Sequence, residues 1–217
     1  MLKLYSYWRS SASYRVRIAL NLKGLPYDYL PVSLVKDGGQ QNLPEYLAVN
    51  PQGRVPFLVD GDFGIGQSLA ILDYLDAGYP QPALIPADAR IRARMWAFCQ
   101  VIAADIQPLQ NTGPLAYMSR ELKLSDEQKN AWVRHWIERG FSVLEQELRD
   151  APLSAFVFGE APTLADCVLV PQMFNAGRYR CDTAKFPRLH ALAQRLNELP
   201  AFAAAHPDRQ PDAQKTV

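Results

Sequence analysis

The chain has 217 residues, of which 23 are basic and 22 acidic, giving a net charge of +1. This balance argues against a nucleic-acid-binding protein with a basic stripe and against a membrane-surface protein with a polybasic arm. Hydrophobic residues make up 48% of the sequence, which is enough to build the core of one large domain or of two small ones.

The three cysteines, Cys99, Cys167 and Cys181, are odd in number and show no C-x-x-C spacing. This pattern argues against a disulfide framework and a structural zinc site, so we expect reduced thiols and no metal. The N-terminal segment MLKLYSYW lacks the apolar core of a signal peptide, and no apolar run approaches the ~18 residues that span a bilayer. We therefore expect a cytoplasmic protein with no membrane partner.

Strand-like and helix-like segments alternate through the first 80 residues. Alternation of apolar and polar residues marks the strands, and apolar residues three or four positions apart mark the helices. Glycine, proline and an Asp-Gly pair supply the expected ends and turns. In chain order we predict a strand at 2–7, a helix at 11–23 ended by Gly24, a strand at 27–32, a short helix at 43–49, a strand after Pro56, a hairpin at Asp60-Gly61 and a helix from residue 68 that ends near Gly78.

The character of the sequence changes after residue 80. Residues 81–88 are rich in proline and break both periodicities, so we interpret them as a linker. The strong patterns beyond the linker are helical, at 89–118, 126–148, 163–179 and 187–199. The sequence thus predicts an α/β domain over 1–80 and an all-helical domain over 89–217, whose polar end HPDRQPDAQKTV is expected to be loosely ordered.

One helix start in the second domain has a specific pattern. Thr163 and Asp166 form a Thr-x-x-Asp capping box ahead of an apolar run. The Thr163 hydroxyl would accept the Asp166 N–H, while the Asp166 carboxylate accepts the Thr163 N–H. This pair serves folding rather than chemistry, and its loss should cost about 1 kcal/mol or more.

The segment YWRSSASYRVR places Ser10 and Ser11 where the first strand gives way to a helix. The start of a helix carries unpaired N–H groups and a partial positive charge, which favour an anion such as a thiolate. Helix capping alone explains one serine at this position, whereas the second needs another reason. Since Ala12 stands where a thiolate of the chain itself could sit, a thiol would have to come from outside.

Several segments, in the same order, resemble the zeta class of glutathione transferases: YSYWRSSASYRVRIALNLKG, KDGGQQ, NPQGRVP, GQSLAILDYL and IQPLQN. The similarity runs from about residue 2 to the polar end. It implies an N-terminal thioredoxin-like domain that binds glutathione, a C-terminal helical domain and a homodimer. Members of the class include maleylacetoacetate isomerase, of tyrosine and phenylalanine breakdown, and maleylpyruvate isomerase.

In this class a serine of a Ser-Ser-Cys motif directs its hydroxyl at the glutathione sulfur, and the resemblance assigns that role to Ser10 and Ser11. A thiol has an ordinary pKa of roughly 8.5, which a helix start or a nearby cation lowers, so thiolate would be available at neutral pH. Ala12 departs from the family's frequent cysteine. The departure removes an auxiliary thiol and leaves the serine and helix-dipole mechanism intact.

Further segments match the family's glutathione site. Val55 matches the residue whose backbone pairs with the cysteinyl part of glutathione, ahead of a cis-proline at Pro56; an ordinary strand-entry proline is the alternative. Gln67 and Ser68 match the pair that binds the γ-glutamyl end, and Ser68 is also a natural N-cap. Gln41, within KDGGQQ, matches the segment near the glycyl end.

Gln107 and Asn111 lie four residues apart, on one face of a helix that Pro108 should kink. By resemblance they lie near glutathione and substrate, and a buried amide network at a domain or dimer boundary is the alternative. Arg9 and Arg178 match arginines that line the family's substrate site. A guanidinium grips a carboxylate with two hydrogen bonds, so two such groups suit a small dicarboxylate.

Other polar and aromatic residues are interpreted as structural. Arg17 lies on the first helix among apolar residues, where an ion pair within the fold is the expected role. The tryptophans of the second domain fall at helical positions that are typical of a core: Trp96, Trp132 and Trp136.

The function that the resemblance implies is cis–trans isomerisation of maleylacetoacetate to fumarylacetoacetate, with glutathione as a regenerated nucleophile. The thiolate would add to the cis double bond next to a carbonyl, and rotation about the new single bond would follow. Arg9 and Arg178 would hold the carboxylates and stabilise the enolate. The alternatives are isomerisation of maleylpyruvate, glutathione transfer or dehalogenation of small α-halo acids, and non-catalytic binding of glutathione.

Overall fold

The computed structural model describes residues 1–149 and 154–214. These residues divide into two compact units. The first contains Met1–Leu84 together with residues 198–214, and the second contains Ile85–Asn197. The C-terminal segment after Asn197 therefore belongs to the unit that the N-terminus builds.

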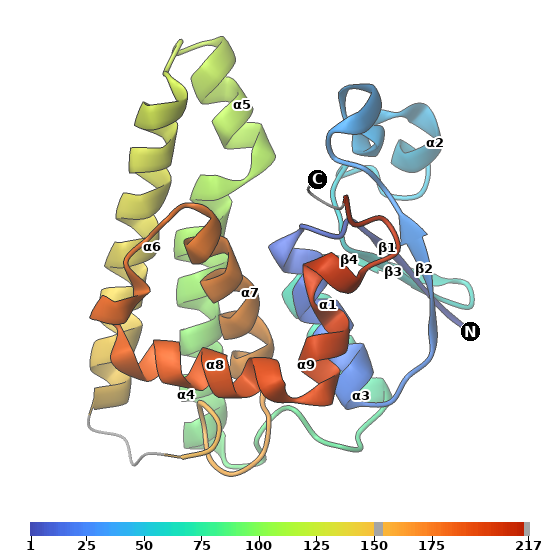
Figure 1. Cartoon of the computed structure of the whole chain (residues 1–217). Coiled ribbons are helices and arrows are strands. Elements are labelled where there is room, and N and C mark those ends of the chain that lie inside the picture. The colour runs from blue at the N-terminus through green and yellow to red at the C-terminus, as the bar shows by residue number, and fades with distance from the viewer. Residues whose placement is uncertain (150–153, 215–217) are drawn as a thin grey trace. The chain divides into compact units, whose positions relative to one another are not determined.

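The first unit is built on a four-stranded sheet with the strand order β2-β1-β3-β4 (Figure 1). β1 (Leu2–Ser6) pairs in parallel with β2 (Tyr27–Pro31) and antiparallel with β3 (Phe57–Asp60). β4 (Phe63–Gly66) completes a hairpin with β3, and Gly61 supplies the positive φ of 61° in its turn. The observed hairpin confirms the predicted one.

Two helices pack their apolar side chains against this sheet. They are α1 (Ser11–Leu22) and α3 (Ser68–Gly78), and Gly24 ends the first of them in the left-handed region, as predicted. Alternate residues of β1 are buried because successive side chains of a strand point to opposite faces. The core consists of buried aliphatic residues from these elements and from β3: Leu2, Leu4, Val16, Leu20, Leu58, Ile71 and Leu75.

Short turns fill the connection between β2 and β3. It contains 3₁₀ turns at Lys36–Gly38 and Gln40–Asn42 and the short helix α2 (Pro44–Leu47). The hydroxyl of Tyr46, in α2, donates to the carbonyl of Arg54 at 2.6 Å. This bond ties the predicted short helix to the loop that enters β3.

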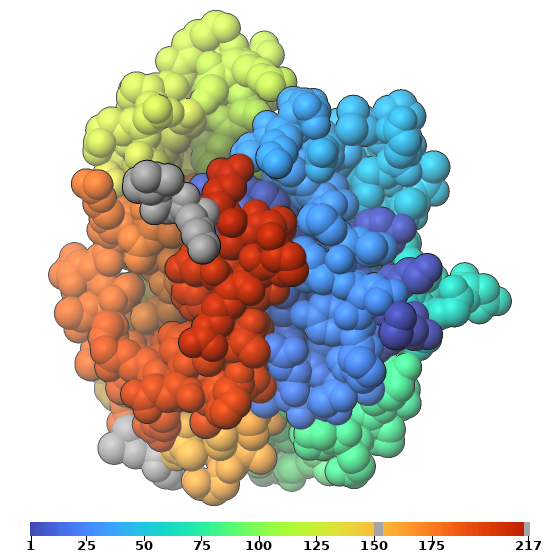
Figure 2. All heavy atoms as spheres, turned by 45° about the vertical axis from the view of Figure 1, so that its right-hand side comes forward, coloured from blue at the N-terminus to red at the C-terminus, as the bar shows by residue number. Residues whose placement is uncertain are grey.

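The C-terminal segment packs against α1. Helix α9 (Pro200–Ala205) runs beside α1, and a 3₁₀ turn follows at Pro207–Arg209. In Figure 2 the red atoms of this segment lie against the blue atoms of the N-terminal residues. The expectation of a loosely ordered end is therefore wrong for residues 206–214, because their polar groups find partners in the first unit; residues 215–217 lie outside the described part.

Helices make up most of the second unit, which confirms the predicted fold class of an α/β domain followed by an all-helical one. No helix in the described part of the chain is long and apolar enough to cross a bilayer. The helices are α4 (Ala89–Gln100), α5 (Thr112–Arg120), α6 (Asp126–Arg149), α7 (Leu164–Arg178) and α8 (Pro187–Glu198), and a 3₁₀ turn lies at Thr183–Lys185.

The helical pattern predicted over 89–118, with a kink at Pro108, is interrupted more strongly than by a kink. α4 passes into a π-helical turn at Val101–Ile106 and then into a 3₁₀ turn at Gln107–Gln110 before α5 begins. Pro108 contributes to this break because it lacks the N–H that a continuing helix would need. Gly140 of α6 lies against the π-helical turn, since a Cβ there would collide with the Ile106 side chain.

α7 begins with the predicted capping box. The Asp166 carboxylate accepts the Thr163 N–H at 2.8 Å and the Val157 N–H at 2.9 Å. The Thr163 hydroxyl donates to the same carboxylate at 2.9 Å. Burial of Asp166 raises the pKa of its carboxyl group to about 6, even though these donors favour the ionised form.

Candidate active site

Three connections of the first unit meet at one edge of its sheet (Figure 1). The register pairs Tyr5 of β1 with Phe57 of β3, and Phe57 with Gly66 of β4. The turn from β1 to α1, the loop that enters β3 and the turn from β4 to α3 therefore share this edge. These are the connections that carry the predicted serines, Val55 and the Gln67-Ser68 pair.

Ser10 and Ser11 occupy different places at the start of α1. Ser10 is the N-cap, with φ −69° and ψ 118°, and its Oγ accepts the Ser13 backbone N–H at 3.2 Å. Ser11 is the first helical residue, and its hydroxyl pairs with no other residue among 1–149 and 154–214. Both side chains are half-buried. Capping thus explains Ser10 and leaves the Ser11 hydroxyl without a structural role.

The start of α1 offers donors to an anion. The N–H groups of Ser11 and Ala12 pair with no backbone or side-chain acceptor in the described residues. Two unpaired N–H groups and the positive end of the helix dipole favour negative charge here. Because Ala12 has only a methyl group, this position supplies no thiol beside these donors.

Arg9 brings a permanent positive charge next to the two serines in the sequence. Its guanidinium lies 5.5 Å from the centre of the Trp8 ring, and the side chain is half-buried. Within the described part of the chain it makes no hydrogen bond or ion pair. Its donors therefore remain available to an anionic ligand.

Val55 presents a free peptide edge in the loop that enters β3. Neither its N–H nor its carbonyl pairs with another described residue. The Val55–Pro56 peptide bond is cis, as the resemblance implied. An extended peptide can pair with such an edge through its own backbone groups.

Gln41 lies beside this loop. A Cβ on Gly53 would come within 3.1 Å of the Gln41 carbonyl oxygen, which shows how closely the two segments pack. The side-chain Oε1 of Gln41 is buried and accepts no hydrogen bond from the described residues. A buried amide oxygen without a donor is costly unless a ligand supplies one.

Gln67 and Ser68 lie at the start of α3, but the prediction that Ser68 is the N-cap is wrong. Gln67 takes the N-cap position with a positive φ of 67°, and its Nε2 donates to Gln52 Oε1 at 2.9 Å. Ser68 is already helical and buried, and its Oγ accepts from Arg15 Nη1 at 3.1 Å. The Ser68 hydroxyl therefore links α3 to α1 instead of capping its own helix.

Arg17 is fully buried, but the expected ion pair is not what holds it. Its guanidinium donates to oxygen atoms of neutral groups, including the carbonyls of Trp8 and Ala205. No carboxylate lies within ion-pair distance of Arg17 among the described residues. Burial lowers the pKa of this guanidinium.

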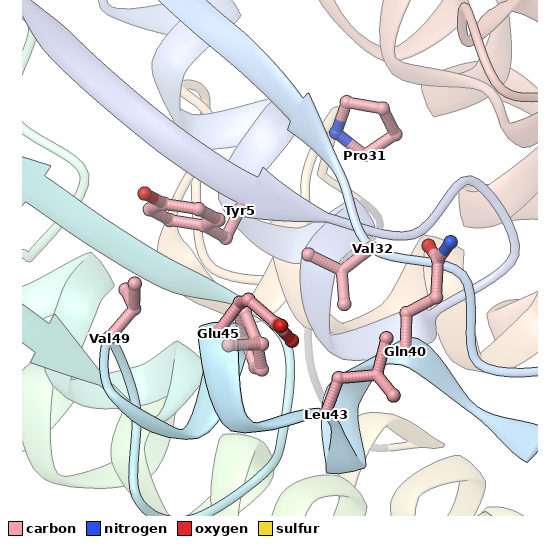
Figure 3. A pocket seen from close by; sticks show the side chains of 8 residues that line it. Tyr5, Pro31, Val32, Gln40, Leu43, Glu45 and Val49 are labelled. Carbon is pink, nitrogen blue, oxygen red and sulfur yellow. The ribbon is translucent and has the colours of Figure 1, made fainter. Parts of the chain in front are cut away.

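A pocket of about 280 Å³ opens in the first unit (Figure 3). It is lined by Tyr5, Pro31, Val32, Gln40, Leu43, Glu45, Tyr46 and Val49. Its polar groups are largely occupied: Gln40 accepts the Ser33 N–H and donates to Asp37, and the Tyr46 hydroxyl donates to Arg54. None of the residues predicted to bind glutathione or substrate lines it.

In the second unit, Gln107 and Asn111 flank the break after the π-helical turn. Gln107 Nε2 donates to Asn111 Oδ1 at 2.6 Å, so the two amides pair as their spacing suggested. The indole N–H of Trp132 donates to the Leu109 carbonyl at 3.0 Å and holds the 3₁₀ turn between them. Trp132 is half-buried rather than a core residue, and it supports this turn.

Arg178 ends a chain of buried amides. Its Nη1 donates to Asn175 Oδ1 at 2.8 Å, Asn175 Nδ2 donates to Gln110 Oε1 at 2.5 Å, and Gln110 Nε2 donates to Gln172 Oε1 at 2.9 Å. A buried amide network thus exists around Gln110, whereas Gln107 and Asn111, for which such a network was the alternative, pair with each other. Asn175 and Gln172 were not predicted, although the i, i+3 spacing of Asn175 and Arg178 was an available signal.

The structure thus divides the predicted residues between the units. Arg9, Ser10, Ser11, Gln41, Val55, Gln67 and Ser68 belong to the first unit, and Gln107, Asn111 and Arg178 belong to the second. Among residues 1–149 and 154–214, no three His, Cys, Asp or Glu side chains form a cluster that could hold a metal ion. Cys99, Cys167 and Cys181 form no disulfide and are buried.

Comparison with family models places this arrangement in a known group. Residues 4–83 match the model of the glutathione S-transferase N-terminal domain. Residues 126–195 match the model of the glutathione S-transferase C-terminal domain. Both units therefore have counterparts in one family.

Individual relatives match almost the whole chain. A probable maleylacetoacetate isomerase of Vibrio cholerae is 47% identical over 210 residues, covering 97% of each protein. The holo structure of a maleylpyruvate isomerase, described as a bacterial zeta-class glutathione S-transferase, superimposes with a TM-score of 0.95 at 42% identity, covering 98% of this chain and 100% of that one. A maleylacetoacetate isomerase of Methylobacterium extorquens with bound malonate and glutathione gives a TM-score of 0.93 at 39% identity, covering 98% and 99%.

Proposed function

The chain belongs to the zeta class of the glutathione S-transferase family, and we propose that it isomerises maleylacetoacetate to fumarylacetoacetate with glutathione as the nucleophile. The observation that carries the proposal is the start of α1, where two serines and two unpaired N–H groups surround a position at which Ala12 supplies no thiol. A thiolate stabilised there must belong to a bound cofactor.

Ser10 is the better candidate for the hydroxyl that binds the thiolate. Its oxygen accepts the Ser13 N–H, which fixes the side chain, while its own proton remains free to be donated. Ser11 has an unoccupied hydroxyl but no such fixed orientation. We therefore assign Ser10 as the primary donor and Ser11 as an auxiliary one, with the helix dipole adding to both.

The peptide part of glutathione suits the groups at the same sheet edge. The free backbone N–H and carbonyl of Val55 fit the cysteinyl backbone of a tripeptide. The buried Gln41 Oε1 fits a donor at its glycyl end. Gln67 and Ser68, at the start of α3, are proposed to bind the γ-glutamyl end, where the helix dipole favours a carboxylate.

A conjugated diacid requires cationic groups. The Arg9 guanidinium has no hydrogen-bond or ion-pair partner in the described residues, so we propose that it grips one substrate carboxylate. The malonate bound to the Methylobacterium relative supports a dicarboxylate of this kind. Arg178, oriented by Asn175 within the second unit, is a candidate for a second carboxylate, and Gln107 and Asn111 are candidates for neutral contacts.

The proposed reaction requires no change in redox state and no water. The thiolate forms a carbon–sulfur bond at the cis double bond, and the electron pair moves onto the neighbouring carbonyl oxygen as an enolate. The former double bond is then single, so it rotates. Collapse of the enolate expels the thiolate and leaves the trans double bond, and a positive charge near the enolate oxygen lowers both barriers.

Maleylpyruvate is the second candidate substrate, because the zeta-class structure with the TM-score of 0.95 is that of a maleylpyruvate isomerase. The same groups would act on it. Glutathione transfer to an α-halo acid differs in outcome, since it would consume the thiol and release halide. A protein that binds glutathione without catalysis would show no turnover of either diacid, and replacing Ser10 or Ser11 would leave its function intact.

We also propose that the protein is a cytoplasmic homodimer, as the resemblance to the class implies. Light scattering during gel filtration measures the molar mass directly. A mass close to twice the 24.4 kDa of one chain is expected, and a mass of one chain would contradict the dimer.

The decisive experiment follows the absorbance of maleylacetoacetate, and in parallel of maleylpyruvate, with and without glutathione. Turnover of either diacid that requires glutathione without consuming it supports the isomerase, and the faster one identifies the substrate. Measurable glutathione binding without turnover of either diacid would contradict it. Halide release from an α-halo acid would then identify the transferase.

A further inference from the structure

Asp212, in the C-terminal segment, binds the turn that precedes the two serines. Its Oδ2 atom accepts the Trp8 backbone N–H at 3.0 Å, and its Oδ1 atom accepts the Tyr29 hydroxyl at 2.6 Å. Trp8 directly precedes Arg9 and lies two residues before Ser10. One carboxylate therefore connects residues 204 positions apart, and it does so at the proposed site.

Arg17 holds the same turn by its carbonyl groups. Its Nη2 donates to the Trp8 carbonyl at 3.0 Å, and its Nη1 donates to Ser6 Oγ at 3.2 Å and to the Tyr7 carbonyl at 3.4 Å. Both peptide groups that flank Trp8 are thus fixed, one through its N–H and the other through its carbonyl. The next peptide groups along the chain lead directly to Ser10.

The C-terminal segment is itself folded so that Asp212 reaches this turn. Arg17 Nε donates to the Ala205 carbonyl at 3.1 Å, at the end of α9. The side chain of Gln210 then donates to the carbonyls of Ala204 and His206 at 3.0 and 2.8 Å. These bonds turn the chain back after α9, and the half-buried Asp212 follows two residues later.

We propose that Asp212 is a positioning residue for glutathione activation, which holds the Trp8–Ser10 turn so that the Ser10 hydroxyl and the start of α1 face the thiolate. The proposal rests on the function proposed above and deepens it. Asp212 is proposed to contact neither glutathione nor substrate. It acts through its hydrogen bond to the Trp8 N–H. A displacement of about 1 Å in a catalytic group can cost up to ~100-fold in rate, so a fixed turn matters.

Replacing Asp212 would change the thiol pKa in opposite directions, depending on whether its charge or its hydrogen bonds matter more. A carboxylate near a thiolate raises the thiol pKa, so removing a charge that acted only through space would lower that pKa. Releasing the turn would instead weaken the stabilisation by Ser10 and the helix start, and the thiol pKa would rise toward its value in free glutathione. The direction of the change therefore separates positioning from simple electrostatics.

Three variants test this. Asp212→Ala removes both hydrogen bonds, and Asp212→Asn removes the charge while its amide can still accept the Trp8 N–H and donate to the Tyr29 oxygen. Asp208→Asn is the matched control, because Asp208 lies in the same segment, is exposed, and has its carboxylate 3.7 Å from His206 Nδ1 within that segment. The thiol pKa of bound glutathione is read from the pH dependence of thiolate ultraviolet absorbance, alongside kcat and the Kd for glutathione.

For Asp212→Ala we expect a raised thiol pKa and a kcat at neutral pH that falls on the order of tenfold. The Kd for glutathione should change little at low pH, where the bound thiol is protonated in both proteins, and should weaken at neutral pH. Asp212→Asn should restore most of kcat, and Asp208→Asn should match the wild type. An unchanged or lowered thiol pKa in Asp212→Ala, even with reduced thermal stability, would overturn the proposal.

If Asp212→Ala does not fold, Tyr29→Phe takes its place, because it removes only the hydrogen bond between Tyr29 and Asp212. A smaller rise of the thiol pKa is then expected, and no rise would overturn the proposal. If the wild type binds glutathione but isomerises no diacid, the proposed function fails by itself, while the thiol pKa of the variants still tests Asp212.

Discussion

The Oγ atom of Ser10 accepts the Ser13 backbone N–H at 3.2 Å, so the side chain that caps α1 also keeps a proton for a second partner. Capping and thiolate binding are therefore compatible in one residue, where the sequence had left them as alternatives. The Ser11 hydroxyl accepts no such hydrogen bond from the described residues. The two serines can be separated by experiment because only one of them supports the helix.

Replacing Ser10 by Ala should lower kcat about 100-fold, because one preorganised donor to the anion is lost. The free energy of unfolding should fall by about 1 kcal/mol through loss of the cap. Ser11→Ala should lower kcat less and leave the free energy of unfolding within about 0.5 kcal/mol of the wild type. Steady-state kinetics and urea unfolding measure the two effects.

Ser10→Thr is the control for this pair, since threonine keeps both the cap and the hydroxyl. It should retain most of the stability and a large part of kcat. A greater loss of kcat in Ser11→Ala than in Ser10→Ala would transfer the primary role to Ser11.

Gln41→Met should separate binding from stability. The buried Oε1 atom has no donor in the described residues, so replacing it by an apolar group should leave the free energy of unfolding unchanged or raise it by about 1 kcal/mol. The same change should weaken glutathione binding severalfold, because the proposed glycyl contact is lost. Calorimetric titration measures the Kd, and thermal unfolding measures the stability.

The neighbouring Gln40 offers a matched comparison. Its amide already accepts the Ser33 N–H at 2.9 Å and donates to Asp37 at 3.2 Å. Gln40→Met should therefore lose about 1 kcal/mol of stability and keep the wild-type Kd for glutathione. Equal weakening of glutathione binding in the two variants would argue that the loop as a whole, and not Gln41, matters.

Arg9→Met should raise the KM for the diacid and lower kcat/KM by on the order of 100-fold, as expected for losing a charged hydrogen-bonding group. Arg9→Lys should recover only part of this loss, because an ammonium cannot bind a carboxylate through a planar fork. The Kd for glutathione should stay close to that of the wild type in both variants. A KM unchanged in Arg9→Met would exclude Arg9 from the substrate contacts.

Local patterns predicted the first unit well because its strands, its Gly24 helix end and its Asp60-Gly61 turn are each determined by neighbouring residues. The break at Gln107–Gln110 was not predicted in its form, since it depends on how Ile106 packs against Gly140 as well as on Pro108. The order of the C-terminal segment likewise depends on contacts far away in sequence.

In the candidate site, too, features set by neighbouring residues were predicted and features set by distant contacts were not. Ser10 at a helix start follows from the sequence, but the capping role given to Ser68 failed because Gln67 adopts a positive φ and moves the cap one residue earlier. Asp212 could not be identified, because its partners Trp8 and Tyr29 lie at the opposite end of the chain. The candidate ligand-binding residues came from resemblance, whereas residues that hold other residues in place required the structure.

Asp166 should make the stability of the protein depend on pH in an unusual direction. Burial raises the pKa of its carboxyl group to about 6 in the folded protein, above the ordinary value of 3.8. Between these two values the folded state binds more protons than the unfolded state, so this group's contribution to the free energy of unfolding falls as pH rises. The contribution is fully present below the unfolded pKa and is lost as pH rises through about 6.

Asp166→Asn removes this titration, and its single amide oxygen can accept only one of the Thr163 and Val157 N–H groups, which bind different oxygens of Asp166. The variant should be less stable than the wild type at low pH, and the difference between them should shrink by on the order of 2 kcal/mol as pH rises from about 4 to about 7. Other carboxylates titrate alike in both proteins and cancel in the comparison. Urea unfolding at several pH values measures the difference, and a gap that widens with rising pH would show that the hydrogen bonds to Asp166 outweigh its burial.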